Sequence, residues 1–192
     1  MEKKAFTLIE LIVVIAIIAI LAAVVAPNAF RAIEKSKITR GMSDAKALRV
    51  ASEAYYADIG FWPPDVNRGA DPGFMQPDAA CPERPSQMAG YNPVAQGFPA
   101  NWNNIIQTNW DGPYIEQWPI RTPWAGLYDW NYWPAGAVRY GVTVPPGCYI
   151  GIQGDYNDNN HISASSEKTL VDNGFDEDKG VNGESQLLMV LF

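Results

Sequence analysis

The sequence predicts an α+β protein in which one long N-terminal helix packs, through its second half, on a small antiparallel sheet. The helix is predicted from an almost unbroken apolar run at residues 6–26, followed by apolar side chains at near-helical spacing over residues 28–59. The sheet is predicted from short strand-like segments in residues 136–192. A chain of 192 residues has room for one membrane anchor and one globular domain, here residues 28–192.

The apolar run at residues 6–26 follows a short charged leader, residues 1–5. Only Thr7 and Glu10 are polar within the run, which is roughly 30 Å long as a helix and so long enough to cross a bilayer. A secretory signal peptide is cut after its apolar segment, whereas the plausible processing point here precedes it. The helix would therefore stay in the product. The leader lysines favour a cytoplasmic N-terminus.

Glu10 is an acidic side chain inside this apolar run. Such a side chain costs about 2.5–3.5 kcal/mol at the centre of a bilayer, and it usually has a partner. Two interpretations stay open: a neighbouring subunit supplies the partner, or the carboxylate of a plain single-pass anchor snorkels to the interface. Pro27 ends the run and is expected to kink the helix, because proline removes one helical hydrogen bond.

Residues 28–59 are predicted to continue the helix with one face for a core. Gly41 is a weak point, costing about 1 kcal/mol relative to Ala. Gly60 and the following Pro63-Pro64 pair are expected to stop the helix. The apolar positions are Phe30, Ile33, Ile38, Met42, Ala45, Leu48, Tyr55 and Ile59.

Residues 61–135 are rich in Pro, Gly, Asn and Trp, so no long regular strand is expected there. Six tryptophans lie between Trp102 and Trp133. They indicate either a face on which sugar rings stack or large buried side chains in a loop-rich domain. Further on, residues 138–144 and 148–153 are expected to form a hairpin through a Pro-Pro-Gly turn, and residues 186–192 a last strand.

The formal net charge of −7 and the lack of a basic patch argue against nucleic-acid binding. Cys81 and Cys148 are expected to form one structural disulfide in an exported domain; two buried free thiols are the alternative. The chain has one histidine, no phosphate-cradling Gly-rich loop and no nucleophile signature. These features argue against an enzyme.

An acidic loop at residues 154–184 holds the one constellation of residues that would carry chemistry. Oxygen side chains alternate from residue 155 and recur later in the loop, as calcium ligands do. The spacing resembles the start of an EF-hand loop, but Asn160 and Ser166 replace the expected Gly and carboxylate. The alternative is a solvated loop that binds nothing. The candidate ligands are Asp155, Asn157, Asn159, Asp176 and Asp178.

Residues 6–10 read Phe-Thr-Leu-Ile-Glu, which resembles the class III signal of the type IV pilin superfamily, with Ala5 where the family usually has Gly. The resemblance implies a pilin-like fold, cleavage between Ala5 and Phe6 by a prepilin peptidase, and methylation of Phe6. It also implies that Glu10 pairs with the new amine of the adjacent protomer, and that Pro27 is the family's kinking proline. A cytoplasmic assembly ATPase and an inner-membrane platform protein are the further partners it implies.

Residues 110–128 resemble a tryptophan- and proline-rich stretch of the major pseudopilins of type II secretion, which hold calcium in their last loop. Asp111, Thr122, Ala125 and Leu127 depart from that stretch. We therefore expect a filament subunit, inserted once in the inner membrane with a periplasmic domain and then assembled into a periplasmic or cell-surface filament. The pseudopilin interpretation leads. A type IV pilus major subunit for adhesion or motility is the alternative, which the disulfide and the long loop region favour. A membrane-anchored glycan-binding module is the second alternative.

Overall fold

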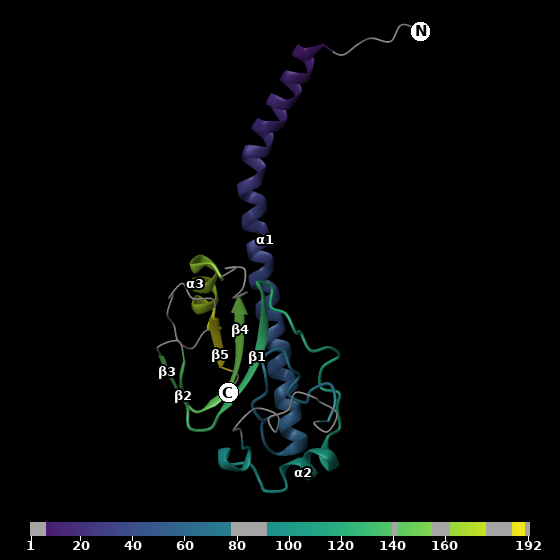
Figure 1. Cartoon of the computed structure of the whole chain (residues 1–192), viewed down its shortest axis with the longest axis vertical. Helices are drawn as coiled ribbons and strands as arrows, with labels where there is room; N and C mark the ends of the chain where they lie inside the picture. Colours follow the sequence, from purple (N-terminus) through teal and green to yellow (C-terminus); the bar gives the residue numbers. More distant parts are fainter. Residues whose placement is uncertain (1–6, 78–91, 140–141, 155–161, 176–185, 191–192) are drawn as a thin grey trace, which may run out of the picture. The chain divides into compact units, whose positions relative to one another are not determined.

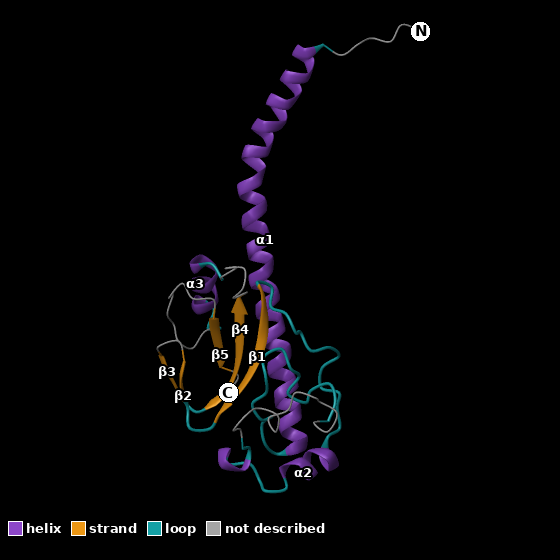
Figure 2. Ribbon diagram, in the orientation of Figure 1, coloured by secondary structure: helices purple, strands orange, loops and turns teal. Residues whose placement is uncertain are grey.

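The structure is a computed structural model of the chain, and it describes residues 7–77, 92–139, 142–154, 162–175 and 186–190. The chain divides into two units, Met1–Lys37 and Ile38–Phe192, and each is described by itself. Figures 1 and 2 show one long helix and a small antiparallel sheet, the α+β pilin-like layout that the sequence predicts. The elements are α1 (Leu8–Ile59), the 3-10 helix η3 (Val94–Gln96), α2 (Trp102–Asn109), β1 (Ala125–Trp133), β2 (Ala137–Arg139), β3 (Val142–Val144), β4 (Gly147–Gly154), α3 (Ala164–Asp172) and β5 (Gln186–Val190).

Helix α1 runs without interruption from Leu8 to Ile59 and includes Pro27. Its amphipathic half is confirmed in the second unit, where the buried positions repeat every three or four residues and face one core. Phe30 and Ile33 differ from the prediction, because they are 71% and 54% exposed. The buried positions of α1 are Gly41, Ala45, Leu48, Ala51, Ser52, Tyr55 and Ile59.

Three strands form an antiparallel sheet in the order β1-β4-β5, and β2 and β3 form a separate two-stranded sheet. In the larger sheet Tyr128 pairs with Ile152, and Trp130 pairs with Ile150. All four of these side chains are fully buried and belong to the same core as the inner face of α1. Successive strand residues point to opposite faces, so the alternate positions of β1 and β4 supply the apolar face that covers the helix.

Three predictions about the region after α1 were wrong. The nine-residue strand β1 lies in the region where no long strand was expected, because its inward Tyr and Trp residues outweigh the polar residues between them. The Pro-Pro-Gly turn at residues 145–147 joins β3 to β4, which belong to different sheets, so it closes no hairpin. Helix α3 lies within the acidic stretch that was expected to be a loop. The last strand is confirmed over Gln186–Val190.

Strand β1 is fastened to α1 and to the chain after it by buried polar side chains. The hydroxyl of Tyr128 donates to Asp44 Oδ2 at 2.8 Å, and the guanidinium of Arg40 lies 3.6 Å from the same oxygen. Burial raises the pKa of Tyr128, and the negative charge of Asp44 adds to the rise. The phenol therefore stays neutral and keeps donating. Trp130 donates its indole N–H to the carbonyl of Pro63 at 3.0 Å.

The seven tryptophans are core residues. Four are at most 8% exposed and the other three are half-buried, so the interpretation as large buried side chains is correct and a flat sugar-stacking face of tryptophans is not formed. Three indoles also anchor loop carbonyls: Trp110 donates to Gly73 at 2.8 Å, Trp118 donates to Gly69 at 3.0 Å, and Trp130 donates to Pro63. These bonds hold the irregular segment after α1 against the core.

Gly41 lets a tryptophan ring lie directly on α1. A Cβ placed at this glycine would be 3.3 Å from Cζ3 of Trp124, which is tighter than an ordinary van der Waals contact. Gly41 is buried and Trp124 is 3% exposed, so the contact has little room to relax. The helix-weakening glycine is thus explained by packing.

We predict that Gly41→Leu lowers the free energy of unfolding of the second unit by about 1–3 kcal/mol, because the new side chain overpacks the space that Trp124 fills. Thermal unfolding of the detergent-solubilised chain, followed by tryptophan fluorescence, measures the change. Ala47→Leu is the matched control, since Ala47 is an exposed position of the same helix. Equal stability of the two variants would show that Gly41 is not a packing position.

Candidate assembly helix and other predicted sites

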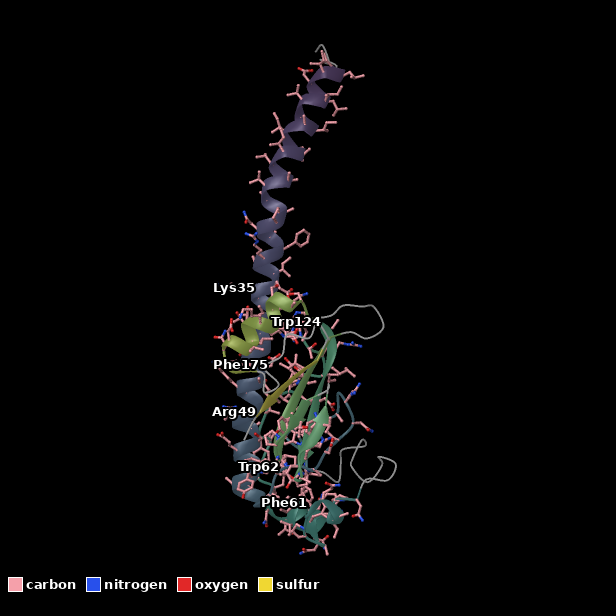
Figure 3. All side chains as sticks on the ribbon, turned by 90° about the vertical axis from the view of Figure 1, so that its left-hand side faces the viewer. Lys35, Arg49, Phe61, Trp62, Trp124 and Phe175 are labelled. Atoms are coloured by element: carbon pink, nitrogen blue, oxygen red, sulfur yellow. The ribbon has the colours of Figure 1, made fainter. Side chains whose placement is uncertain are left out.

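The apolar half of α1 presents its side chains outward all along its length. Exposure of its large apolar residues runs from 46% at Val14 to 74% at Leu8. Figure 3 shows these side chains extending from the ribbon. Among the described residues, α1 is the one helix that is long and apolar enough to cross a membrane. A surface of this kind is stable only in lipid or against other apolar helices.

The N-terminus of α1 is capped by two residues that hydrogen-bond to each other in both directions. The carbonyl of Thr7 accepts the first helical bond, from Leu11 N at 3.3 Å, which makes Thr7 the N-cap. Its hydroxyl oxygen accepts from Glu10 N at 3.2 Å. In return, Glu10 Oε2 accepts from Thr7 N at 2.8 Å and from the Thr7 hydroxyl at 2.7 Å. This is a capping box, which satisfies backbone donors that no helical carbonyl reaches.

The capping box gives Glu10 a partner inside its own chain, which neither sequence interpretation included. The signal was present, because Thr-x-x-Glu ahead of an apolar run is the sequence signature of a capping box. In the described part of the chain, the bonds to this carboxylate all reach Oε2. Oε1 can therefore accept from a second donor while the cap stays formed.

Pro27 lies inside α1, and the helix does not end there. A proline has no N–H to donate, so the carbonyl four residues before it, that of Ala23, lacks its usual helical partner. Pro27 thus weakens the hydrogen-bond ladder locally within α1, and the expected kink stays a prediction.

The predicted calcium ligands, Asp155, Asn157, Asn159, Asp176 and Asp178, lie outside the described residues. Within the described ranges, no group of three or more His, Cys, Asp or Glu side chains is placed to hold a metal ion. Between the two halves of the predicted loop, α3 is capped by Ser163, whose side chain accepts from Ser166 N. Glu167 on this helix is fully buried. Calcium binding stays a prediction.

Cys148 is a buried free thiol on β4, and burial raises its pKa. Cys81 lies outside the described residues. The structure thus shows no disulfide at the one cysteine that it describes, and the Cys81–Cys148 pair stays a prediction.

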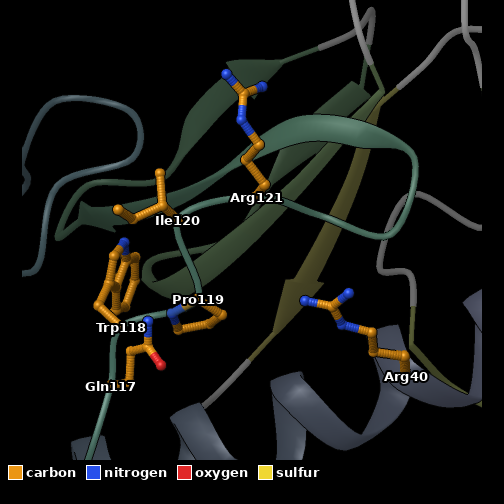
Figure 4. Close-up of a pocket in the computed structure, with 6 residues that line it drawn as sticks. All are labelled: Arg40, Gln117, Trp118, Pro119, Ile120 and Arg121. Atoms are coloured by element: carbon orange, nitrogen blue, oxygen red, sulfur yellow. The ribbon is translucent and has the colours of Figure 1, made fainter.

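A hollow of about 420 Å³ lies beside α1 in the second unit (Figure 4). Arg40 and Arg121 stand at its edges, and Trp118 and Pro119 form part of its wall. Both guanidinium groups have partners: Arg40 pairs with Asp44, and Arg121 donates to the carbonyl of Ala125 at 2.9 Å. The hollow offers donors and apolar surface, and its lining residues include no nucleophile or carboxylate.

Comparison with known proteins bears on the N-terminal segment. The family model of the prokaryotic N-terminal methylation motif matches residues 1–26. This motif marks type IV pilin-like proteins, and the long apolar helix fits it. The N-terminal segment of the chain therefore carries the motif that marks type IV pilin-like proteins. No curated protein and no solved structure matches the chain significantly.

The matched residues span the leader, the Thr7–Glu10 capping box and the exposed apolar helix up to Ala26. The motif implies processing by a prepilin peptidase and assembly into a filament. It also indicates a structural protein, since proteins of this type are typically not enzymes.

We predict that the mature chain begins at Phe6 and carries a methylated amine, because the processing motif lies directly behind the short leader. Intact mass and N-terminal sequencing of protein taken from its native host decide this. Ala5→Gly should be cut at the same bond, since it restores the residue usual in the family. A mature chain that retains residues 1–5 would contradict the prediction.

Proposed function

We propose that this pilin-like protein is a pseudopilin, a subunit of the short filament that acts in type II protein secretion. The observation that carries the filament role is the capped, exposed apolar helix within the residues that match the methylation motif. Many such helices bury their apolar faces against one another, and the acidic domains stay outside. The pseudopilin role is the finer step, and it rests on residues 110–128.

Residues 110–128, which resemble the pseudopilin stretch, connect the loop after α1 to the sheet. Trp110 and Trp118 donate to carbonyls of that loop, and Tyr114 N donates to the carbonyl of Phe74 at 2.8 Å. The resemblance therefore falls on residues that support the domain. A type IV pilus major subunit is the competing proposal, and a Cys81–Cys148 disulfide would favour it. The glycan-binding module loses its basis, because the tryptophans form the core.

Assembly is proposed to join Glu10 of one copy to the Phe6 amine of the next. The capping box holds the Glu10 carboxylate beside the start of its own helix through Oε2. Oε1 would accept the incoming ammonium group, and a charge-assisted hydrogen bond of this kind is about twice as strong as a neutral one. The peptidase creates the amine. A platform protein supplies the place where the subunit joins the filament, and an assembly ATPase supplies the energy for that step.

Before assembly, the protein is proposed to cross the inner membrane once, with its domain in the periplasm. The apolar helix and the motif fit membrane anchoring. Charge alone does not fix this orientation, since two lysines precede the apolar run and four basic residues follow it within residues 27–40. The proposed orientation is the one that the resemblance to the type IV pilin superfamily implies.

We predict that both Glu10→Gln and Glu10→Ala abolish filament formation while leader cleavage continues. The glutamine can still accept from Thr7 and keep the cap, but it lacks the charge that the neighbouring amine needs. Sheared filament fractions and electron microscopy measure assembly, and intact mass measures cleavage. Glu34→Gln, on the same helix, is the control. If Glu10→Gln assembles and Glu10→Ala does not, Glu10 acts as a helix cap and not as an ionic partner.

We predict that calcium raises the melting temperature of the full chain in detergent relative to chelator. A site filled at a hundredfold excess over its dissociation constant stabilises by about 2.7 kcal/mol. Asp155→Ala or Asp176→Ala should erase most of the difference, whereas Asp111→Ala, at an exposed site elsewhere, should not. Identical melting of the wild type in calcium and in chelator would remove one of the two arguments for a pseudopilin.

A further inference from the structure

Although the chain has no basic patch of the kind that binds nucleic acid, a short basic band follows the apolar run and contrasts with the rest of the chain. Residues 27–40 contain four basic residues and one acidic residue, whereas residues 41–192 contain eight basic and eighteen acidic residues. Arg31, Lys35 and Lys37 fall in the first structural unit, on α1, and we call them the basic collar. Figure 3 labels Lys35 on this part of the helix.

The collar lies at a defined depth relative to the apolar run. Along a helix, Arg31 is about 7.5 Å beyond Ala26 and Lys37 is about 16 Å beyond it. The polar headgroup layer on each side of the hydrocarbon is about 5–8 Å thick. When the apolar run spans the hydrocarbon, Arg31 therefore reaches the headgroups directly. Lys35 and Lys37 reach them from the water side, because long basic side chains extend toward the interface.

The side chains of the collar are accessible to lipid headgroups. Arg31 and Lys35 are exposed, and they are four residues apart on one face of α1. Lys37 pairs with Glu34 at 3.5 Å, but both side chains are partly exposed, and surface ion pairs of this kind contribute about 0–1 kcal/mol. The net charge of the band therefore stays positive.

Apolar side chains in the same band are also exposed. Phe30 is 71% exposed and Ile33 is 54% exposed, and they lie three residues apart, on one face of the helix. Exposed apolar side chains among basic ones are typical of helices at a membrane interface, where the apolar groups enter the boundary of the acyl chains. In water alone, the apolar side chains of Phe30 and Ile33 would stay exposed to solvent.

We infer that the basic collar binds the phosphate groups of anionic phospholipids in the leaflet opposite the leader, and so holds the subunit at a fixed depth before assembly. Each Lys or Arg near an anionic surface adds attraction that salt weakens. Residues 41–192 carry a net negative charge, which the same surface repels. The inference rests on the membrane insertion given under the proposed function and goes beyond the secretion role.

The test uses the full chain in nanodiscs made from equal amounts of phosphatidylcholine and phosphatidylglycerol. Native mass spectrometry counts the lipids that stay bound to the released protein. We expect phosphatidylglycerol to be retained at least about threefold over phosphatidylcholine, and the preference to fall as sodium chloride is raised. Changing Arg31, Lys35 and Lys37 together to Gln should bring the ratio close to one.

The matched control changes Lys46, Arg49 and Lys168 to Gln, which removes the same charge from exposed sites of the second unit. It should keep the wild-type preference, and tryptophan-monitored melting checks that both variants fold. No preference in the wild type, or equal loss in the control, would overturn the inference. So would a collar variant that keeps its lipid preference and fails only in filament assembly, because the collar would then contact the acidic domain of a second copy.

Insertion is measured separately, by co-elution with nanodiscs of phosphatidylcholine alone. A wild-type chain that does not insert would count against membrane anchoring itself, and with it against the collar. A chain that inserts and shows no lipid preference would count against the collar alone.

Discussion

The domain depends on indole rings that fill space and donate hydrogen bonds at once. Residues 60–77, the described segment after α1, contain no helix or strand, so their carbonyls cannot be satisfied by a helix or a sheet ladder. Trp110, Trp118 and Trp130 supply three of the missing donors, from positions 37, 49 and 67 residues away along the chain. A buried ring of this size also removes more apolar surface from water than any aliphatic side chain would. A loop-rich chain with few strands can thus form a packed core.

The long helix could be predicted because its signals are local. An apolar run, an amphipathic repeat and a stop at Gly60 each occupy a few consecutive residues, and α1 ends at Ile59. Strand β1 was missed for the opposite reason. Asp129 and Asn131 break its apolar pattern, and both are nevertheless only 8% exposed. Strand β4 pairs with β1 and β5, which are distant in sequence, and the turn residues 145–147 do not indicate this pairing.

In the candidate sites too, some features could be predicted from the sequence and others could not. Glu10 was identified because a carboxylate within an apolar run is costly, and the run itself matches the methylation motif. The role of Thr7 was missed, although the Thr-x-x-Glu spacing encodes it. Calcium binding and the disulfide depend on which distant residues come together. Their residues fall largely outside the described ranges, so sequence reasoning is the present basis for both.

The capping box has a consequence for the energetics of the filament. In a lone subunit, the Thr7 and Glu10 amides and the Glu10 carboxylate oxygen Oε2 already satisfy one another through the capping box. In the proposed filament, docking on a neighbour then adds one charge-assisted contact at Oε1, a single directional bond that contributes about 1.5–3 kcal/mol. The end contact therefore selects register and order of addition. Cohesion must come from the side-to-side packing of the apolar helices, where close fit, and not escape from water, favours association. In such a filament, undoing the packing would return each subunit to the bilayer with its helix already capped.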